Sequence, residues 1–211
     1  MEGKKIILHY FNLNCRGIIL RLLLKYGNIQ FEDKRVSFEE WGSLKSTYDF
    51  KFMPVLEIDG VQHSQAYSLY VYVARKIGGL LGKTAEEEQE ILCALLCLED
   101  INSKIVQKEH QQVDETTGIT NLKNTALQIV SGLETLYKRL GKGEFFIGDS
   151  LSLADFFLVA IFKVYLFGIG KEFLKESINE QAPNLSNLVE RLISSDLFVK
   201  LLKEVEIPGA F

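Results

Sequence analysis

The stretch that most constrains this chain runs from Phe52 to Tyr67 and reads FMPVLEIDGVQHSQAY. Residues 55–58 have the apolar pattern of a short strand, and Asp59-Gly60 is a strong signal for a hairpin turn. A second short strand follows the turn, and a helical pattern opens at Gln65. The stretch therefore predicts two antiparallel strands that lead directly into a helix.

Pro54 sharpens the prediction for the corner before the first of these strands. Proline cannot donate a hydrogen bond to a sheet, so Pro54 belongs at the first residue of the strand or in a tight turn, where a cis peptide bond is an option. We expect the Met53 backbone to face outward there, beside the amides of the helix that opens at Gln65. Such a corner can hold a peptide carboxylate, although an ordinary strand, hairpin and helix without a ligand has the same pattern.

The residues before this stretch complete an α/β unit. Apolar runs and helical spacing predict a strand over 5–10, a helix over 16–26, a second strand over 29–36 and a short helix from Phe38. Together with the central stretch, whose helix is expected to end near Ile77, the order of elements is β-α-β-α-β-β-α. The pattern predicts a compact α/β domain over residues 1–79.

The rest of the chain has a helical pattern throughout. The glycine-rich residues 78–83 are typical of a linker. Helices are expected over 86–113, 121–140, 156–167 and, as one or two helices, 185–203. Ser152 and Asp155 have the spacing of a capping box, which satisfies the first amides of a helix. We therefore expect a second, all-α domain over residues 86–211.

Composition narrows the class of protein. The chain has 211 residues, 47% of them hydrophobic and 25% charged, which suffices for one large domain or two small ones, each with a core. Its net charge is -4 and no basic block is interleaved with aromatic residues, which argues against nucleic acid as a partner. No apolar run has the length of a signal peptide or a membrane span, so we expect a soluble, cytoplasmic protein without a membrane partner.

The chain has three cysteines, Cys15, Cys93 and Cys97. An odd number without the spacing of a metal site predicts neither a structural disulfide nor a bound metal. Cys93 and Cys97 lie four residues apart in a helical pattern, where buried thiols are expected.

The order of motifs along nearly the whole chain resembles that of the cytosolic glutathione transferases. The resemblance is carried by Tyr10-Phe11-Asn12 with Arg16, by Trp41 followed by Lys45-Ser46-Thr47, by MPVLEIDG from Met53, by Gln65, and by GDSLSLAD from Gly148 to Asp155. It is greatest to the sigma-like class, which includes glutathione-dependent prostaglandin D synthases and S-crystallins. The resemblance implies a thioredoxin-like first domain that binds glutathione as co-substrate, and a helical second domain that shapes the site for a small hydrophobic electrophile.

The resemblance also implies a detoxifying transferase that works as a homodimer without a metal. Tyr10 takes the place of the catalytic tyrosine, and Arg16 that of an arginine that supports it electrostatically. Glutathione would be bound by Trp41 and Lys45 at its glycine carboxylate, by Met53 before Pro54 at its cysteinyl unit, by Gln65 and Ala66 at its γ-glutamyl end, and by Asp100 from the other subunit. A tyrosine suits the catalytic position because its phenol, with a pKa near 10, stays protonated at neutral pH and donates to the thiolate of glutathione.

The chain departs from the family pattern in three places. Ala66 stands where the family usually has a serine that binds the γ-glutamyl carboxylate, and Phe52 stands where a lysine is common. Asn14-Cys15 replaces an arginine-glycine pair in the first loop. The first two changes predict glutathione binding that is weak for the family.

Two other functions share these features. Cys15 lies near a helix start, where its pKa can fall, so the chain could be a thiol transferase that uses this residue. A non-catalytic dimer that serves as a structural or ligand-carrying protein is favoured by Phe52 and Ala66 but opposed by the retained Tyr10 and Arg16. The sequence gives no support to prostaglandin isomerisation, because no tryptophan follows Asp100 in the long helix.

Overall fold

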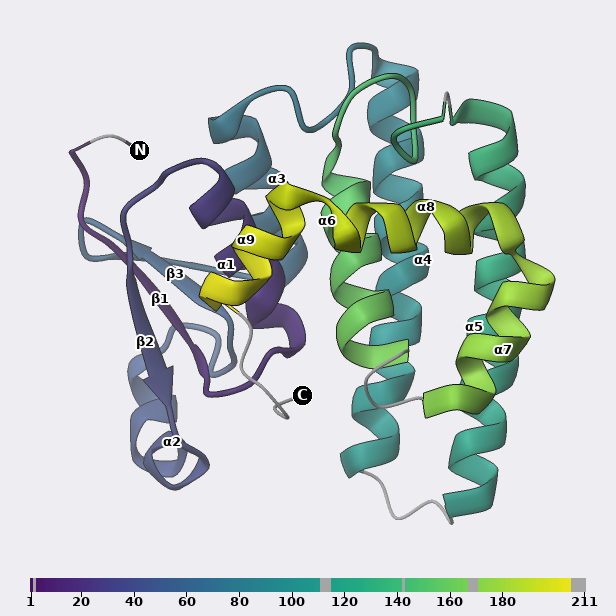
Figure 1. Cartoon of the computed structure of the whole chain (residues 1–211). Coiled ribbons are helices and arrows are strands. Elements are labelled where there is room, and N and C mark those ends of the chain that lie inside the picture. The colour runs from purple at the N-terminus through teal and green to yellow at the C-terminus, as the bar shows by residue number, and fades with distance from the viewer. Residues whose placement is uncertain (2, 111–114, 142, 167–170, 206–211) are drawn as a thin grey trace. The chain divides into compact units, whose positions relative to one another are not determined.

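The computed structural model describes residues 1, 3–110, 115–141, 143–166 and 171–205 (Figure 1). The chain forms two compact units. The first contains Met1–Gly78 together with the residues from Lys200 onward, and the second contains Gly79–Val199. The expected linker at Gly78-Gly79 therefore coincides with the boundary between the units.

The first unit is built on a four-stranded mixed sheet in the order β2-β1-β3-β4. Its elements are β1 (Ile6–Phe11), α1 (Cys15–Tyr26), β2 (Glu32–Val36), α2 (Phe38–Leu44), the 3-10 helix η1 (Lys45–Thr47), β3 (Val55–Ile58), β4 (Val61–Ser64) and α3 (Ala66–Ile77). Strand β1 pairs parallel to β2 and antiparallel to β3, and β4 completes the predicted hairpin. The predicted order of elements is confirmed.

Strand β1 and helix α1 form the core of this unit. Residues 6–10 of β1 are all buried, which is the pattern of a central strand covered on both faces, and residues 17–24 of α1 are buried all round. Helix α1 packs against α3. One boundary differs from the prediction: β2 begins at Glu32 rather than at residue 29, because Gly27 ends α1 and Asn28 adopts a left-handed conformation with φ of 51°.

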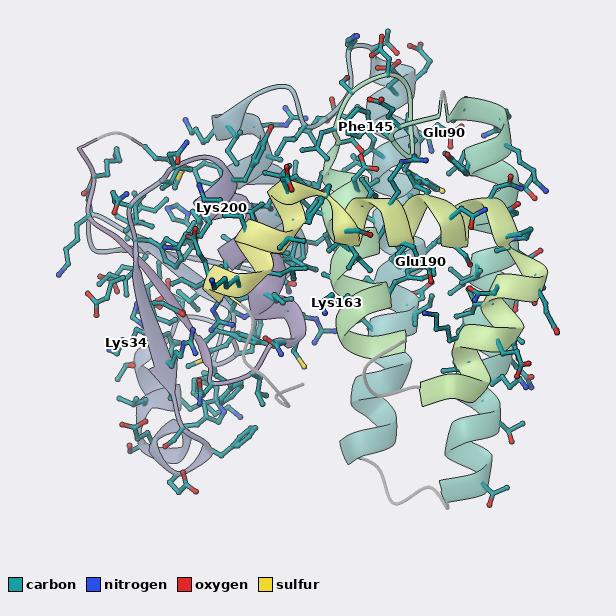
Figure 2. The ribbon with its side chains drawn as sticks, in the orientation of Figure 1. Lys34, Glu90, Phe145, Lys163, Glu190 and Lys200 are labelled. Atoms are coloured by element: carbon teal, nitrogen blue, oxygen red, sulfur yellow. The ribbon has the colours of Figure 1, made fainter. Side chains whose placement is uncertain are left out.

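The second unit is all-helical, as predicted. Its elements are α4 (Ala85–His110), α5 (Glu115–Leu140), α6 (Leu153–Val159), the π-helical η2 (Ala160–Leu166), α7 (Lys171–Gln181), α8 (Pro183–Ser194) and the start of α9 (Asp196–Val205). Ion pairs tie neighbouring helices: Glu90 of α4 to Arg139 of α5 at 2.7 Å, and Glu190 of α8 to Lys175 of α7 at 3.1 Å (Figure 2). Pro183 occupies the first turn of α8, where its missing N–H costs nothing.

The start of α5 differs from the boundary predicted from the sequence. Helix α5 begins at Glu115 rather than at residue 121, so Gly118 lies within a helix and not in a break; the glycine costs about 1 kcal/mol there, which the packing of a long helix offsets. Residues 111–113 and 167, expected to end two helices, lie outside the described residues. Residues 200–205 of α9 belong to the first unit, where Glu204 lies 3.5 Å from Lys25.

Within the described ranges, no helix is both long and apolar enough to cross a membrane. The same residues contain no group of three or more His, Cys, Asp or Glu side chains that could hold a metal ion.

Candidate functional site

Tyr10 lies near the end of β1 with its side chain only 5% exposed. Its ring packs on Gly17 of α1, where an added Cβ would come within 2.3 Å of the Tyr10 Cδ1 atom. The guanidinium carbon of Arg21, one helical turn further along α1, lies 5.9 Å from the centre of the same ring. Only glycine at position 17 therefore leaves room for the tyrosine in this place.

The surroundings of Tyr10 keep its hydroxyl protonated. Burial raises the pKa of the Tyr10 phenol well above its ordinary value, and the nearby Cys15 adds to this effect. The charge of Arg16 and a hydrogen bond from its backbone act in the opposite direction but are weaker. At neutral pH, Tyr10 is consequently a neutral hydrogen-bond donor in a positive field.

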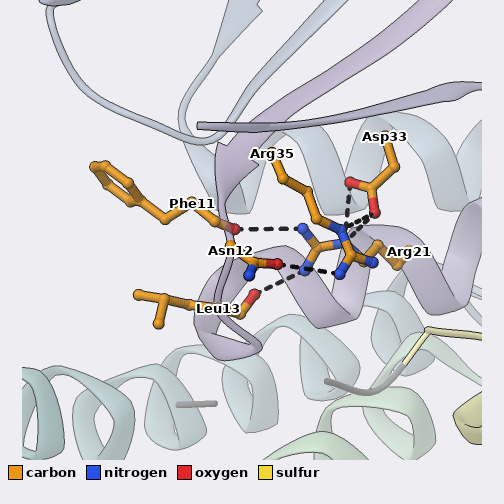
Figure 3. A network of polar contacts seen from close by, with 6 residues as sticks. All are labelled: Phe11, Asn12, Leu13, Arg21, Asp33 and Arg35. Carbon is orange, nitrogen blue, oxygen red and sulfur yellow. Dashed lines mark hydrogen bonds and ion pairs between the residues drawn. The ribbon is translucent and has the colours of Figure 1, made fainter. Parts of the chain in front are cut away.

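Arg21 holds the loop that follows Tyr10 (Figure 3). Its Nε donates to both carboxylate oxygens of Asp33 on β2, each at 3.1 Å. Its terminal nitrogens donate to the main-chain carbonyls of Leu13 at 2.7 Å and Phe11 at 3.4 Å. The guanidinium is 1% exposed, so this buried cation replaces several bonds that the loop would otherwise make to water.

Arg35 completes the network from the outside. It donates to Asp33 at 2.8 Å and to the side-chain oxygen of Asn12 at 3.1 Å (Figure 3). Sequence reasoning missed both arginines. One signal pointed to Arg21, a single charge inside the otherwise apolar run from Ile18 to Leu24, where a buried cation needs a partner.

Trp41 and Lys45 lie together on α2 and the turn after it, as predicted. Helix α2 begins with a capping box in which Ser37 and Glu40 satisfy each other's backbone amides. The Lys45 amide donates to the Trp41 carbonyl one turn back, and the Lys45 side chain is exposed. The Trp41 ring is half-buried against Phe11, with ring centres 5.5 Å apart.

The structure also brings together the two ends of the central stretch. The Met53-Pro54 bond is cis, and β3 starts at the next residue. Because Val55 pairs with Ser64 in an antiparallel register, continuing the ladder places Pro54 opposite Gln65. Gln65 has a positive φ of 73°, and α3 begins directly after it at Ala66.

Gln62 anchors the loop between α2 and this corner. Its side-chain nitrogen donates to the carbonyl of Thr47 at 3.1 Å, and its side-chain oxygen accepts from the amide of Asp49 at 3.2 Å. No motif in the sequence predicted this role. Gln62 thus ties the segment that carries Lys45 to the hairpin that carries Gln65.

Asp100 and the three cysteines are the remaining candidate residues. Asp100 is exposed on α4, in the second unit. Cys15 is the first residue of α1 and only 9% exposed. Cys97 is half-buried, but Cys93 is exposed, so the expectation that both are buried was wrong for Cys93; the fourfold spacing places them on one helix face but does not say what covers it.

A mixed sheet with a neutral tyrosine at the end of its first strand, a cis-proline corner and an all-helical second unit define the class of proteins with a thioredoxin-like domain followed by a helical domain. Residues 119–196 match the model of the glutathione S-transferase C-terminal domain. The chain is 31% identical to glutathione S-transferase 2 of Manduca sexta, over 90% of this chain and 92% of that protein. It is 34% identical to hematopoietic prostaglandin D synthase of Gallus gallus, over 71% and 74% of the two chains.

Solved structures agree with this similarity. A Caenorhabditis elegans glutathione transferase superposes with a TM-score of 0.84 at 25% identity, covering 99% of this chain and 100% of that one. Rat hematopoietic prostaglandin D synthase, in complex with a quinoline, superposes with a TM-score of 0.82 at 26% identity, covering 96% and 98%. This chain belongs to the glutathione transferase family and is an enzyme of that family, and its similarity to the prostaglandin D synthases fits the sigma-like class.

Proposed function

We propose that this glutathione transferase joins the thiolate of glutathione to a small hydrophobic electrophile, with the Tyr10 hydroxyl stabilising the thiolate. The observation that carries the proposal is the buried phenol at the end of β1, whose raised pKa keeps it protonated. A phenol in that state donates a hydrogen bond to a sulfur anion and does not compete with it as an anion.

The gain from such a donor is large at neutral pH. A thiol with a pKa of about 8.5 is only a few per cent ionised there, whereas a pKa of about 6.5 makes roughly three quarters of it thiolate. Arg16 supports the same shift, because its charge lowers the pKa of Tyr10 and so favours negative charge near the hydroxyl. The Arg21 network supports it further by holding the loop after Tyr10, so that little reorganisation accompanies the reaction.

The predicted binding residues of the first unit fit the parts of glutathione. Lys45 is an exposed cation one helical turn after Trp41, which suits the glycine carboxylate. The Met53 backbone, at the cis-proline corner, suits the main chain of the cysteinyl unit. Gln65 and the first amides of α3, from Ala66 onward, suit the γ-glutamyl carboxylate, because backbone amides at a helix start attract anions.

The helical unit would provide the binding site for the electrophile. On this proposal the enzyme is a cytoplasmic homodimer in which Asp100 of each subunit contacts the γ-glutamyl amine at the other subunit's site. Support for the Asp100 role comes from its exposure on α4, which leaves the carboxylate accessible to a second subunit.

Conjugation of chlorodinitrobenzene tests the role of Tyr10. We expect Tyr10→Phe to lower turnover by about 10-fold to 1000-fold, because one donor to a developing anion is lost while the ring is kept. Glutathione affinity by calorimetry and the free energy of unfolding should change little. Turnover of Tyr10→Phe close to that of the wild type would refute the assignment.

Cys15→Ser in the same assay separates the two alternatives. Because Cys15 is buried at the start of α1, we expect this variant to keep most of its conjugating activity. Loss of activity in Cys15→Ser together with its retention in Tyr10→Phe would favour a thiol transferase. An inactive wild type that still binds glutathione would favour the non-catalytic dimer.

A further inference from the structure

His9 is a buried titratable residue on the other side of β1 from Tyr10. Side chains alternate along a strand, so His9 and Phe11 share one face while Tyr10 lies on the opposite face with α1. The His9 residue is 4% exposed. Its Nδ1 atom lies 3.1 Å from the hydroxyl of Tyr48, and its Nε2 atom lies 3.3 Å from a carboxylate oxygen of Glu57 on β3.

The partners of His9 select one neutral tautomer. The Glu57 carboxylate can only accept, so the proton lies on Nε2, and the lone pair of Nδ1 accepts from the Tyr48 hydroxyl. The Nε2 contact lacks the alignment of a hydrogen bond, and within the described chain this buried atom has no other partner. A second proton would go to Nδ1 and would turn that nitrogen into a donor. The Tyr48 hydroxyl would then have to rotate from donating to accepting.

Tyr48 connects His9 to the proposed glutathione site. Its ring meets His9 edge-on with centres 5.5 Å apart, and it lies against Trp41 with centres 5.6 Å apart. Trp41 in turn packs edge-on against Phe11, the residue after Tyr10. A change in the position of the Tyr48 ring therefore changes the environment of Trp41, because the two aromatic rings are in direct contact.

Charged groups face His9 from both neighbouring strands. Lys34, labelled on β2 in Figure 2, is its register partner, Glu32 lies on the same strand, and Glu57 faces it from β3. Burial lowers the pKa of His9 and Lys34 lowers it further, while Glu57 and Glu32 act in the opposite direction but more weakly. His9 is therefore neutral at pH 7, and its protonation needs a lower pH than that of an ordinary histidine.

We propose that His9 is a positioning residue for glutathione: its neutral imidazole fixes Tyr48 and thereby Trp41, and its protonation releases them and weakens glutathione binding. The link to glutathione rests on the proposed function, in which Trp41 contacts the glycine carboxylate. The link from His9 to Trp41 rests on the contacts within the first unit alone.

The link from His9 to Trp41 can be measured directly, because Trp41 is the only tryptophan in the sequence and so the only source of tryptophan fluorescence. In the ligand-free protein, lowering the pH from about 7.5 should shift the Trp41 emission in one transition, with a midpoint below the ordinary histidine pKa of about 6.5. His9→Gln should abolish the transition. Tyr48→Phe, which removes only the hydroxyl, should remove most of it while the fold is kept. His63→Gln, an exposed histidine in the same unit, is the matched control and should retain it.

Calorimetry over the same pH range tests the link from Trp41 to glutathione binding. The dissociation constant of S-methylglutathione, whose sulfur has no proton to lose in this pH range, should rise about threefold to tenfold on acidification in the wild type and in His63→Gln, but stay nearly constant in His9→Gln. Steady-state kinetics should show the same effect in KM for glutathione rather than in a His9-dependent change of kcat.

Two results would overturn the proposal. A fluorescence transition that persists in His9→Gln would show that another group moves Trp41. A transition that follows His9 while glutathione affinity does not would break the link to binding. Failure of the Tyr10→Phe prediction would refute the proposed catalytic role but leave the fluorescence result standing, so the two failures are distinguishable.

Discussion

Helices α3 and α6 differ in how their N-termini are capped by side chains. At α6, the buried carboxylate of Asp155 accepts from the amides of Phe146 and Ser152 and from the Ser152 hydroxyl, each at 2.8 Å. At α3, the residue before the helix is Gln65, whose side chain forms no cap hydrogen bond in the described chain, and the first helical residue is Ala66. The start of α6 is capped by a buried carboxylate, whereas the Gln65 side chain does not cap the start of α3.

Helix α8 is capped by a carboxylate, as α6 is. Glu134 of α5 accepts from the amide of Leu185 at 2.7 Å and from the side chain of Asn184 at 2.6 Å, so a distant carboxylate caps this helix. These hydrogen bonds lower the pKa of Glu134 although its burial acts in the opposite direction. In this enzyme, capped helix ends stabilise the helical unit, and the start of α3, which the Gln65 side chain does not cap, is where glutathione is proposed to bind.

The largest expected effect is on the α6 cap. Asp155→Ala leaves two buried amides without their acceptor, at roughly 1–3 kcal/mol each, so we expect the free energy of unfolding to fall by about 2–5 kcal/mol. Ser37→Ala, in the more exposed capping box of α2, is the matched control and should cost less. Urea denaturation measures both. Equal losses in the two variants would mean that burial does not distinguish the caps.

The pH dependence of stability tests the same carboxylate. Burial raises the pKa of Asp155 to about 6, although hydrogen bonds from Phe146, from Ser152 and from its own backbone oppose the rise. The folded state then binds a proton more tightly than the unfolded state, so the stabilisation is present below the ordinary pKa of 3.8 and is lost as the pH rises through about 6. Between about pH 4 and pH 7 we expect a relative loss of about 2 kcal/mol. Asp155→Asn should lack this component in denaturation curves, and an identical pH profile would contradict the prediction.

At α3, the comparison predicts a gain rather than a loss. Ala66→Ser adds a hydroxyl at the N-terminus of α3, and a hydrogen bond to a charged group contributes about 1.5–3 kcal/mol. We expect glutathione to bind roughly tenfold to a hundredfold more tightly, as measured by calorimetry. Ser68→Ala, which removes a hydroxyl two residues further along the same helix, is the control. Tight and equal affinity in the wild type and Ala66→Ser would show that the hydroxyl is not needed.

The smallest expected effect is at Asp100, which would show that the helical unit also contributes to glutathione binding. If Asp100 of the helical unit serves the other subunit's glutathione site, Asp100→Ala should raise KM for glutathione by about twofold to fivefold, as for an exposed charge worth up to about 1 kcal/mol, with less effect on kcat. Glu86→Ala, an exposed acid on the same helix, should change neither. A protein that sediments as a monomer at micromolar concentration would remove the basis for this expectation.

Local patterns determined the elements of this protein. Apolar periodicity, the Asp59-Gly60 turn and Pro54 predicted the order of strands and helices, and the Ser152 to Asp155 spacing predicted the cap of α6. These predictions succeeded because backbone sterics and burial of one face act over a few neighbouring residues. The same locality placed Tyr10 near the end of its strand and Trp41 one helical turn before Lys45, on α2 and η1.

Only the tertiary structure decided how distant polar groups pair. Arg21 meets Asp33, His9 meets Tyr48, and Glu134 caps α8 from 51 residues away. A buried polar group must find a partner, but the sequence does not say which one, because the choice depends on which surfaces the whole chain buries together. For the same reason the exposure of Cys93 and the packing of the residues from Lys200 with the first unit could be known only from the folded chain.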